Sequence, residues 1–250
     1  MFSSEQWLAN SGADFYNGVA TQSLRLDHGS SAYLYRTPSD TGNRRKFTWS
    51  GWVKINSQPS GKNIVFLGAG NSSTNSSIFY FDGSNQNLRW YHLTGGGSQV
   101  GKSYAGKLRD NSSWYHIVFA VDTGVADSGD TYADSNRVRI YLNGTELRTT
   151  DANFGVIGQN SDLLHVNTNI QHQIGHYVGT TSYSDIYLAE VNFVNDAQLT
   201  PSSFGETKNG VWIPKEPDVS EYGTNGFRLK FDQAGVGTAG TSTIGADTSG

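Results

Sequence analysis

Residues 136–144 read NRVRIYLNG, and this stretch decides the fold class of the chain. Val138, Ile140 and Leu142 alternate with more polar neighbours, which is the period of a strand that buries one of its two faces. Asn143-Gly144 follows at once, and both residue types tolerate the positive φ angles of a type I′ turn. The stretch therefore predicts a half-buried antiparallel strand that enters a two-residue hairpin.

Similar strand patterns recur along most of the chain. Residues 23–27 and 227–231 alternate between apolar and polar side chains in the same way. The runs 47–55, 114–121 and 186–194 are apolar on both faces, which is typical of central strands covered on both sides. Many short strands with turn residues between them, and no alternation of strands with helices, predict an all-β fold, an antiparallel β-sandwich.

Helical signals occur in two short stretches. In the first dozen residues, Ser3 and Gln6 match a capping box that would start a short helix. A second helical turn is predicted after Thr200, because Pro201 fits the first position of a helix. We therefore expect a short N-terminal helical arm and one further turn, with the other regular structure in strands.

Composition narrows the classes of protein and partner. The chain has 250 residues, no cysteine and a formal net charge of −4. Without cysteine there are no disulfides and no cysteine–zinc sites, and the mildly acidic balance gives no basic surface for nucleic acid. No apolar run approaches the ~20 residues of a membrane-spanning helix, so we expect no membrane insertion. The first residues, MFSSEQWLANSG, lack the basic start and long apolar stretch of a secretory signal.

Residues 96–103, GGSQVGKS, match the phosphate-loop pattern G-x-x-x-x-G-K-[ST] at every fixed position. Such a loop binds nucleotide only where it lies between a strand and the start of a helix. Here Gly106 interrupts the short segment after Lys102, and the next strand pattern follows soon after. The stretch is therefore predicted to be a glycine-rich hairpin loop, and we expect no nucleotide binding.

An ordered set of motifs along residues 23–231 resembles the concanavalin A-like lectin/glucanase superfamily in its laminin-G-like branch. More closely, it is similar to modules in virion proteins of marine tailed phages. The segments that carry the resemblance are SLRLDHGSSAYLYRTPS (23–39), NRRKFTWSGWVK (43–54), LRWY (88–91), WYHIVFAVDT (114–123), NRVRIYLNG (136–144), LAEVNFVNDAQLTPSSFGE (188–206), NGVWIPK (209–215) and YGTNGFRLKF (222–231). The resemblance implies a concanavalin A-like jelly roll of two curved antiparallel sheets.

The resemblance also implies a function, a location and partners. The expected function is that of a structural virion protein in a tail fibre, a spike or the capsid surface, located at the surface or tail of the phage particle. The partners would be other virion proteins and further copies of the chain, with a trimer suggested by analogy to phage fibres. A glycan-binding module that recognises host receptors is the alternative, and a glycoside hydrolase ranks third. We expect no enzymatic activity.

Three parts of the chain are predicted from these patterns. Residues 1–20 precede the matched region and form an arm for anchoring or assembly, residues 21–233 form the laminin-G-like sandwich, and residues 234–250 form a Gly/Thr/Ser-rich tail. The tail is expected to be either loose or a loop. The candidate anchoring side chains of the arm are Phe2, Trp7 and Leu8.

Residues 216–221, EPDVSE, match the E-x-D-x-x-E pattern of the retaining glucanases in this superfamily. Retaining hydrolysis needs two carboxylates about 5–5.5 Å apart, one as nucleophile and one as acid. That geometry requires a regular strand, whereas Pro217 removes a backbone donor within the motif. The motif is therefore predicted to be an exposed acidic loop, and no catalytic residue is assigned.

Two groups of side chains offer metal ligands without matching a metal motif. The groups are the histidines His165, His172 and His176 and the acids Asp127, Asp130 and Asp134. On a strand, the last two histidines would be roughly 13 Å apart, too far for one ion. The acids could serve calcium, which laminin-G-like domains often bind, but their spacing does not fit a calcium loop. We predict no metal site and no cofactor, with calcium as the alternative.

Aromatic residues are the remaining candidates for binding, since the chain has six tryptophans and thirteen tyrosines. Sugars bind by stacking on such rings beside a few polar groups, so Trp90, Tyr91 and Trp212 are candidate glycan contacts. Aromatic rings also fill the cores and interfaces of sandwiches. The spacing of these residues does not separate the two interpretations.

Overall fold

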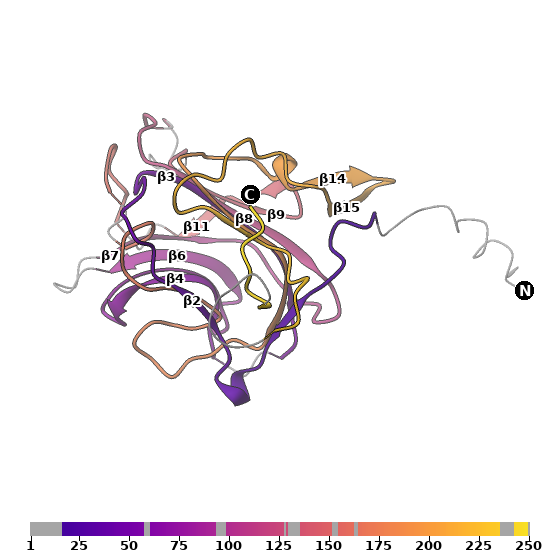
Figure 1. Cartoon of the computed structure of the whole chain (residues 1–250). Helices are drawn as coiled ribbons and strands as arrows, with labels where there is room; N and C mark the ends of the chain where they lie inside the picture. The colour runs from indigo at the N-terminus through magenta and orange to yellow at the C-terminus, as the bar shows by residue number, and fades with distance from the viewer. Residues whose placement is uncertain are drawn as a thin grey trace, which may run out of the picture.

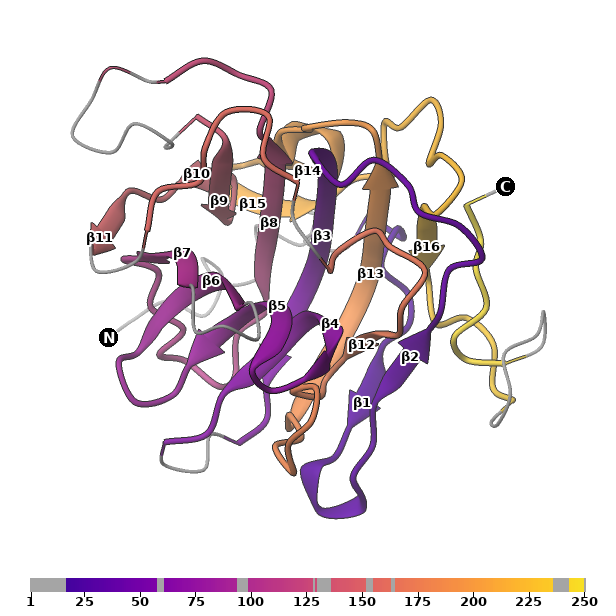
Figure 2. The same ribbon diagram turned by 90° about the vertical axis from the view of Figure 1, so that its left-hand side faces the viewer.

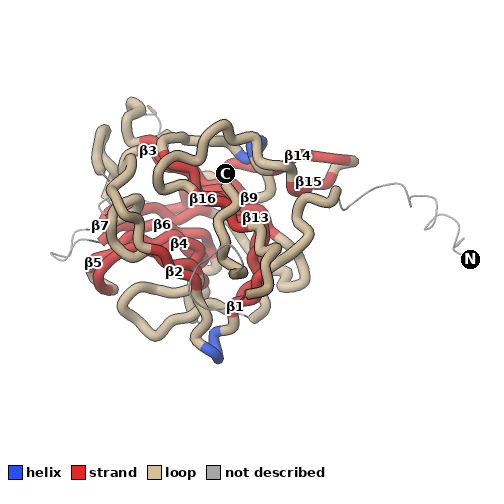
Figure 3. The backbone as a smooth tube through the Cα atoms, viewed as in Figure 1, coloured by secondary structure: helices blue, strands red, loops and turns tan. Residues whose placement is uncertain are grey.

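Nearly all regular structure in this protein is strand. The computed structural model describes residues 17–57, 61–93, 99–127, 129, 136–151, 155–162, 165–235 and 243–249. In these residues two seven-stranded sheets face each other, as Figures 1 and 2 show from two sides. Within the described ranges, helix is limited to two 3₁₀ turns, η1 (His28–Ser30) and η2 (Pro201–Ser203), which are blue in Figure 3. The prediction of an all-β antiparallel sandwich is confirmed.

The first sheet, which we call the β3 sheet, has the strand order β1–β13–β3–β8–β9–β10, and all its pairs are antiparallel. Two short strands share the outer edge of β13: β1 pairs with residues 186–188 and β16 with residues 191–193. The strands are β1 (Leu24–Leu26), β3 (Lys46–Ile55), β8 (Tyr115–Asp122), β9 (Val138–Leu142), β10 (Thr145–Glu146), β13 (Ile186–Asn195) and β16 (Phe227–Leu229).

The second sheet, which we call the β5 sheet, has the order β11–β7–β6–β5–β4–β12–β2 and is also antiparallel. Its strands are β2 (Leu34–Arg36), β4 (Ile64–Ser72), β5 (Asn75–Asp82), β6 (Asn87–Leu93), β7 (Gln99–Tyr104), β11 (Thr149–Asp151) and β12 (His172–Ile174). A separate two-stranded hairpin consists of β14 (Gly205–Lys208) and β15 (Val211–Pro214). It projects from the sandwich at the right of Figure 1.

The hydrophobic core lies between the two sheets and is built from their inward-facing aromatic side chains. Phe79 of β5 stacks on Phe119 of β8, with ring centroids 4.6 Å apart. Trp49 of β3 lies 5.9 Å from Phe66 of β4. All four side chains are 1% exposed or less. Because burial of one large apolar side chain contributes about 1.5–3 kcal/mol, these cross-sheet contacts hold the two layers together.

The three runs predicted as central strands are β3, β8 and β13, and they are covered on both faces as predicted. On the outer face of the β3 sheet, Val118, Ala120 and Val194 are buried against Phe204, which follows η2. The helical turn expected after Thr200 is η2. The segment that follows β13 therefore forms a second, smaller hydrophobic layer outside the sandwich.

The predicted Asn–Gly hairpin is present between β9 and β10. Asn143 and Gly144 have φ angles of +47° and +82°, and Leu142 pairs with Thr145 across the turn. Positive φ at both central residues is the mark of a type I′ turn. A second Asn–Gly pair, with φ of +52° at Asn209 and +79° at Gly210, joins β14 to β15.

The phosphate-loop pattern falls on a strand. Gly101, Lys102 and Ser103 lie in β7 and pair in register with β6, while Gly96 lies outside the described residues. Lys102 is 2% exposed. The side chain that would have to reach a phosphate is therefore buried, and the strand–loop–helix order that the motif requires is not formed in the described part of this segment.

The described ends of the chain lie against different parts of the fold. Phe2, Trp7 and Leu8, the predicted anchors, lie outside the described residues. In residues 243–249, the amide of Thr248 donates to the carbonyl of Arg228, and Ile244 packs against the core. This part of the predicted tail is docked along β16.

None of the helices in the described ranges is long and apolar enough to cross a membrane.

Candidate functional site

An exposed aromatic surface, which we call the tyrosine edge, lies beside β2 at the end of the β5 sheet. It consists of Tyr33, Tyr35 and Tyr183 grouped around His176. The imidazole of His176 stacks on Tyr183 with ring centroids 4.4 Å apart, and Tyr33 lies 5.0 Å from His176. Tyr35 lies 5.8 Å from Tyr33 and is 64% exposed. Tyr35 thus presents its ring to solvent, while Tyr33 and Tyr183 are half-buried against the buried histidine.

The alternation of side chains along β2 places these tyrosines. Leu34 packs against the hydrophobic core. Because successive side chains of an extended chain point to opposite faces, Tyr33 and Tyr35 on either side of Leu34 both point outward. Since β2 is the last strand of the β5 sheet, its outer edge has no further strand among the described residues. Tyr35 therefore stays open to solvent.

The loop between β12 and β13 fixes the histidine of the tyrosine edge. His176 Nδ1 lies 2.8 Å from Oε1 of Gln173, and Nε2 lies 2.9 Å from the carbonyl oxygen of Thr180. Gly175 has a φ of +88°, and a Cβ at that position would lie 2.4 Å from Cδ1 of Leu26. Only glycine fits there. Both partners are acceptors, so the nitrogen that carries the proton donates to one of them and fixes the ring, and the surface needs little ordering before it binds a ligand.

The chemistry of the tyrosine edge suits a flat ligand that is partly apolar and partly polar. Each tyrosine offers an apolar ring face and a hydroxyl group that both donates and accepts hydrogen bonds. A sugar ring has the same two characters, with C–H groups on its face and hydroxyls at its rim. The surface can therefore bind by stacking and hydrogen bonding without any covalent chemistry.

Trp90 and Tyr91, two of the predicted glycan contacts, lie on β6 and are engaged within the protein. Trp90 is 1% exposed in the core, so its assignment as a glycan contact is wrong. It shares the inward face of β6 with Leu88. Tyr91 packs edge-on against Tyr80 with centroids 5.4 Å apart, and its hydroxyl lies 2.6 Å from that of Tyr177.

Trp212, the third predicted glycan contact, anchors the β14–β15 hairpin on the outer face of the β3 sheet. Its ring stacks on His116 at 5.9 Å, and His116 in turn stacks on Trp52 at 4.9 Å. A Cβ on Gly144 or Gly205 would lie within 2.8 Å of the indole ring. A side chain at either glycine would clash with the indole, so Gly144 and Gly205 leave the space that Trp212 occupies.

Ser50 and His116 form a serine–histidine pair in which the imidazole proton lies on the nitrogen that faces the serine, and this arrangement does not suit nucleophilic catalysis. Ser50 Oγ lies 2.9 Å from His116 Nε2, and the indole N–H of Trp212 donates to His116 Nδ1 at 3.0 Å. Indole nitrogen can only donate, so Nδ1 must carry the lone pair and Nε2 the proton. Burial lowers the pKa of His116 to about 3, which keeps the ring neutral. His116 therefore donates to Ser50 and cannot act as its base.

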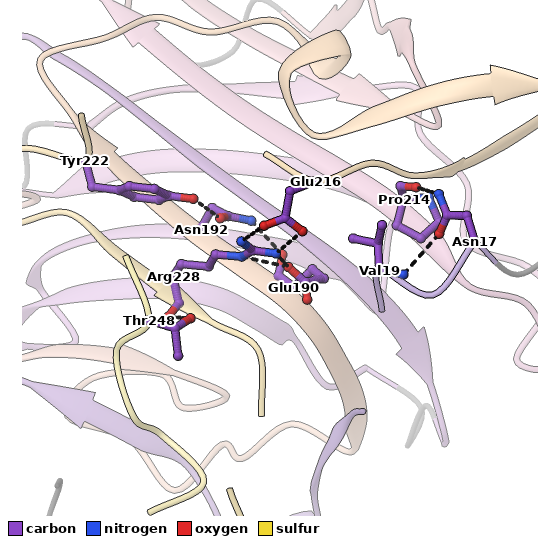
Figure 4. A network of polar contacts seen from close by, with 9 residues as sticks. All are labelled: Asn17, Val19, Glu190, Asn192, Pro214, Glu216, Tyr222, Arg228 and Thr248. Atoms are coloured by element: carbon purple, nitrogen blue, oxygen red, sulfur yellow. Dashed lines mark hydrogen bonds and ion pairs between the residues drawn. The ribbon is translucent and has the colours of Figure 1, made fainter. Parts of the chain in front are cut away.

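Glu216, the first acid of the E-x-D-x-x-E match, is the exposed end of an ion network whose other members, Glu190 and Arg228, are buried (Figure 4). It lies in the loop after β15, as predicted, and its carboxylate accepts from Nη1 and Nη2 of Arg228. Glu190 accepts from Nε and Nη2 of the same guanidinium at 3.0 and 2.8 Å. Glu190 has a φ of +47° at a bulge in β13, where the pairing shifts between Ala189 and Asn192.

The electrostatics of this network follow from burial and from Arg228. Burial raises the pKa of Glu190, and Arg228 offsets part of that effect. Hydrogen bonds from Arg228 lower the pKa of Glu216. A raised and a lowered carboxyl pKa is the combination that glycosidases use, but here the guanidinium lies between the two acids. A substrate oxygen would have to occupy the place of Arg228, so the network is suited to cross-linking β13, β16 and the loop after β15.

The predicted metal ligands do not converge among the described residues. His172 accepts from the backbone amide of Asn167 through Nε2, while the nitrogens of His176 bond to other groups. Burial lowers the pKa of His165. Asp127 pairs with Arg137. Asp130 and Asp134 lie outside the described residues.

One small cavity opens at the end of the sandwich. Its volume is about 20 Å³, enough for a water molecule but not for a sugar ring. Its lining includes Arg36, Leu67, Asn167, His172, Phe193 and Phe227. This cavity is therefore too small for a ligand of the size of a sugar.

Three metal-ligating side chains do converge at η1, close to the tyrosine edge. They are Asp27, His28 and Asp185, and their ligand atoms all lie within 4.8 Å of one another. His28 Nδ1 is 3.6 Å from Oδ2 of Asp185. The sequence did not reveal this group, because Asp185 joins the other two only through the pairing of β1 with β13.

Comparison with known proteins gives the following matches. A family model described as the concanavalin A-like lectin/glucanases superfamily matches residues 28–202. No curated protein sequence matches the chain. The native heptameric SAP-like pentraxin from Limulus polyphemus aligns with a TM-score of 0.42 and 15% identity over 67% of this chain and 71% of that chain. Domains LG4-5 of the mouse laminin α1 chain align with a TM-score of 0.47 and 8% identity over 85% and 48%. Trypanosoma rangeli sialidase aligns with a TM-score of 0.39 and 18% identity over 64% of this chain and 22% of that chain. This chain therefore spans less than half the length of the laminin and sialidase chains.

Proposed function

This chain belongs to the concanavalin A-like lectin/glucanases superfamily, and we propose that it is a non-catalytic structural module on the surface of a tailed-phage particle. The proposed place is a tail fibre, a spike or the capsid surface, where other virion proteins and further copies of the chain are its partners. The support for this role is the ordered set of motifs in residues 23–231, which resembles modules of such virion proteins.

The position of Arg228 carries the non-catalytic part of the proposal. In the superfamily's retaining hydrolases, two acids face a cleft with the substrate between them. Here Glu190 and Glu216 both bind the guanidinium of Arg228, and Glu190 is 5% exposed. The Ser50–His116 pair is also disqualified by its proton position. Both features act as structural cross-links.

Purified particles of the phage that encodes the chain provide the direct test. We expect peptides of the chain in density-purified particles, and labelling of intact particles by an antibody raised against the sandwich. A chain found only in the soluble fraction of the lysate, with none in purified particles, would contradict the structural role.

Assembly through the N-terminal arm is a second part of the proposal. The side-chain amide of Asn17, near the end of the arm, donates to the carbonyl of Pro214 in β15, so this part of the arm lies beside β15 (Figure 4). Phe2, Trp7 and Leu8 are proposed to dock on a neighbouring virion protein. Deletion of residues 1–12 should leave a folded sandwich with the same urea midpoint and prevent incorporation into particles. Unfolding of the deletion variant would instead assign the arm to the core of its own domain.

Recognition of host glycans is a second candidate function, and Tyr35 favours it. The ring is 64% exposed beside Tyr33, in a surface held by the buried His176. An exposed, preordered aromatic surface is the kind of site that binds sugars by stacking. Glycan binding and a structural role are compatible, since one face of a sandwich can bind while another is held by neighbours.

A glycan array tests this candidate with a matched pair of variants. We expect a saturable signal for the wild-type chain that is lost in Tyr35→Ala. Trp114→Ala removes an aromatic ring that is 37% exposed and is not part of the tyrosine edge, so it should keep the signal. An equal loss in both variants, or a signal that survives Tyr35→Ala, would exclude the tyrosine edge as the glycan site.

A further inference from the structure

Asp185 carries a buried negative charge without a permanent positive partner among the described residues. Its side chain is 5% exposed. Asn56 Nδ2 donates to both carboxylate oxygens at 3.1 Å, and Ser57 Oγ donates to Oδ2 at 2.6 Å. In the part of the chain that is described, its one ion-pair contact is with His28. Buried charges in proteins are as a rule paired or bound to metal, so this carboxylate points to a cation.

We propose that Asp27, His28 and Asp185 bind a divalent transition-metal ion of the zinc class. One imidazole nitrogen with two carboxylate oxygens suits zinc and its neighbours, whereas calcium and magnesium take sets of oxygen ligands. Bonds of about 2.0–2.2 Å place the ligand atoms of a tetrahedral site about 3.4 Å apart. The distance between His28 Nδ1 and Asp185 Oδ2 is 3.6 Å, and no pair in the group exceeds 4.8 Å.

The surroundings of the three side chains are those of a metal site with one open position. Asn56 and Ser57 orient Asp185, as outer partners commonly orient ligating carboxylates. The carboxylate of Asp27 is oriented in the same way, because the amide of Gly29 and the hydroxyl of Ser30 donate to it at 3.2 and 3.0 Å. The side chain of His28 is 48% exposed, so an ion can enter from solvent and the ring can close the remaining gap.

A metal ion at this place would tie the two sheets together next to the tyrosine edge. Asp27 and His28 belong to the turn that joins β1 of the β3 sheet to β2 of the β5 sheet. Asp185 directly precedes β13. The ion would therefore link two segments of the tyrosine edge: the β1–β2 connection, which contains Tyr33, and the start of β13, which follows Tyr183. The inference rests on these ligands alone and does not depend on a role in virions or on glycan binding.

Isothermal titration of the full chain, first treated with a chelator, tests the site with zinc chloride as the probe. We expect one zinc ion per chain for the wild type and at least tenfold weaker binding for His28→Ala. Cobalt(II) gives a second measurement, because a tetrahedral site produces visible absorption bands that His28→Ala should remove. Asp218→Asn, which changes an acid whose side chain is 82% exposed and lies outside the group, should bind zinc like the wild type.

Three results would overturn the assignment. One is the absence of saturable zinc binding by the wild-type chain. Another is equal zinc affinity in the wild type and His28→Ala, which would place the ion elsewhere. The third is calcium binding that needs Asp27 but not His28, measured with Asp27→Asn, which would make this an oxygen-only calcium site. His28 is half-exposed, so its replacement should leave the fold intact, and circular dichroism would verify this.

Discussion

Two histidines each lie within an aromatic stack, and the two stacks differ in what covers them. On the outer face of the β3 sheet, His116 lies between Trp52 and Trp212, and the imidazole is 1% exposed. The β14–β15 hairpin, which carries Trp212, closes this stack from outside. Both faces of the imidazole are therefore occupied by rings of the protein, and Trp212 itself is partly buried. The stack therefore serves to hold the hairpin on the sheet.

The stack at the tyrosine edge has similar chemistry but an open side. His176 lies beside Tyr33 and Tyr183, and its exposed fraction is only 8%. Tyr35, which extends the stack, is 64% exposed because no described element covers the edge of β2. Aromatic residues around a histidine do not by themselves indicate a binding site. What separates the two stacks is whether another part of the chain has already taken the outer ring face.

Removal of Trp212 should have the largest effect on stability and would test the structural role of the covered stack. Trp212→Ala leaves a gap over His116 and removes the donor to its buried Nδ1. We expect the free energy of unfolding to fall by about 3 kcal/mol, the lower end of the range for Trp→Ala in cores. Urea denaturation measures it. Trp114→Ala, at a ring that is 37% exposed, should change it by less than about 0.5 kcal/mol. Similar losses in the two variants would break the comparison.

The covered stack should also make stability depend on pH. Burial lowers the pKa of His116 to about 3 from an ordinary value of 6.5. Between these values the unfolded chain binds a proton that the folded chain does not, so stability is lost as pH falls below 6.5. One such group contributes a loss of about 2.3 kcal/mol between pH 6.5 and 4.5. His92 and His172, each with a pKa lowered to about 4 by burial, act in the same direction.

His116→Gln isolates the share of this one histidine. Glutamine keeps a donor and an acceptor at the site but does not titrate. Urea denaturation at several pH values below 6.5 gives the free energy of unfolding of both proteins as a function of pH. This free energy should change less steeply with pH in the variant, by about 1.4 kcal/mol per pH unit. Equal slopes would mean that His116 becomes charged in the folded protein, which would contradict its burial in a closed stack.

The two Asn–Gly turns offer a smaller and sharper test of how tightly Trp212 is held. Gly144 and Gly210 have nearly equal φ angles, +82° and +79°, so alanine should meet similar backbone strain at both, about 1 kcal/mol. A Cβ at Gly144 would lie 2.8 Å from Cε3 of Trp212, whereas one at Gly210 would have no atom within 4 Å. Gly144→Ala should therefore cost about 1 kcal/mol more than Gly210→Ala, because overpacking adds to the strain. Equal midpoints in urea would show that Trp212 moves freely.

The sequence predicts well those features that depend on neighbouring residues. The Asn143-Gly144 turn and the central strands follow from local alternation, and both are confirmed. Even the burial of Trp90 could have been predicted, because Leu88 and Trp90 occupy alternate positions on one strand. Their shared face was the available signal, and aromatic character alone was misleading.

Features that depend on the pairing of distant strands could not be predicted. Tyr35 is open because β2 pairs with β12 at the end of the β5 sheet, and the alternation within 33–36 does not reveal that position. Asp185 meets His28 only because β1 pairs with β13. The network of Glu190 and Arg228 depends in the same way on β16 lying against the bulge in β13. In each case an order of strands, and not a motif, brings the residues together.

Tyr35→Ala should have the smallest effect on stability and gives the complementary test of the open stack. The side chain is 64% exposed, and its described ring contact is with Tyr33 at 5.8 Å. We expect the free energy of unfolding to change by less than about 0.5 kcal/mol, as for other surface substitutions. Tyr33→Ala should cost more, since Tyr33 also packs on His176 and Tyr183. A loss in Tyr35→Ala that approaches the loss in Trp212→Ala would mean that the open ring is structural. If the loss is small, the ring contributes little to folding and its exposed face is free to bind a ligand.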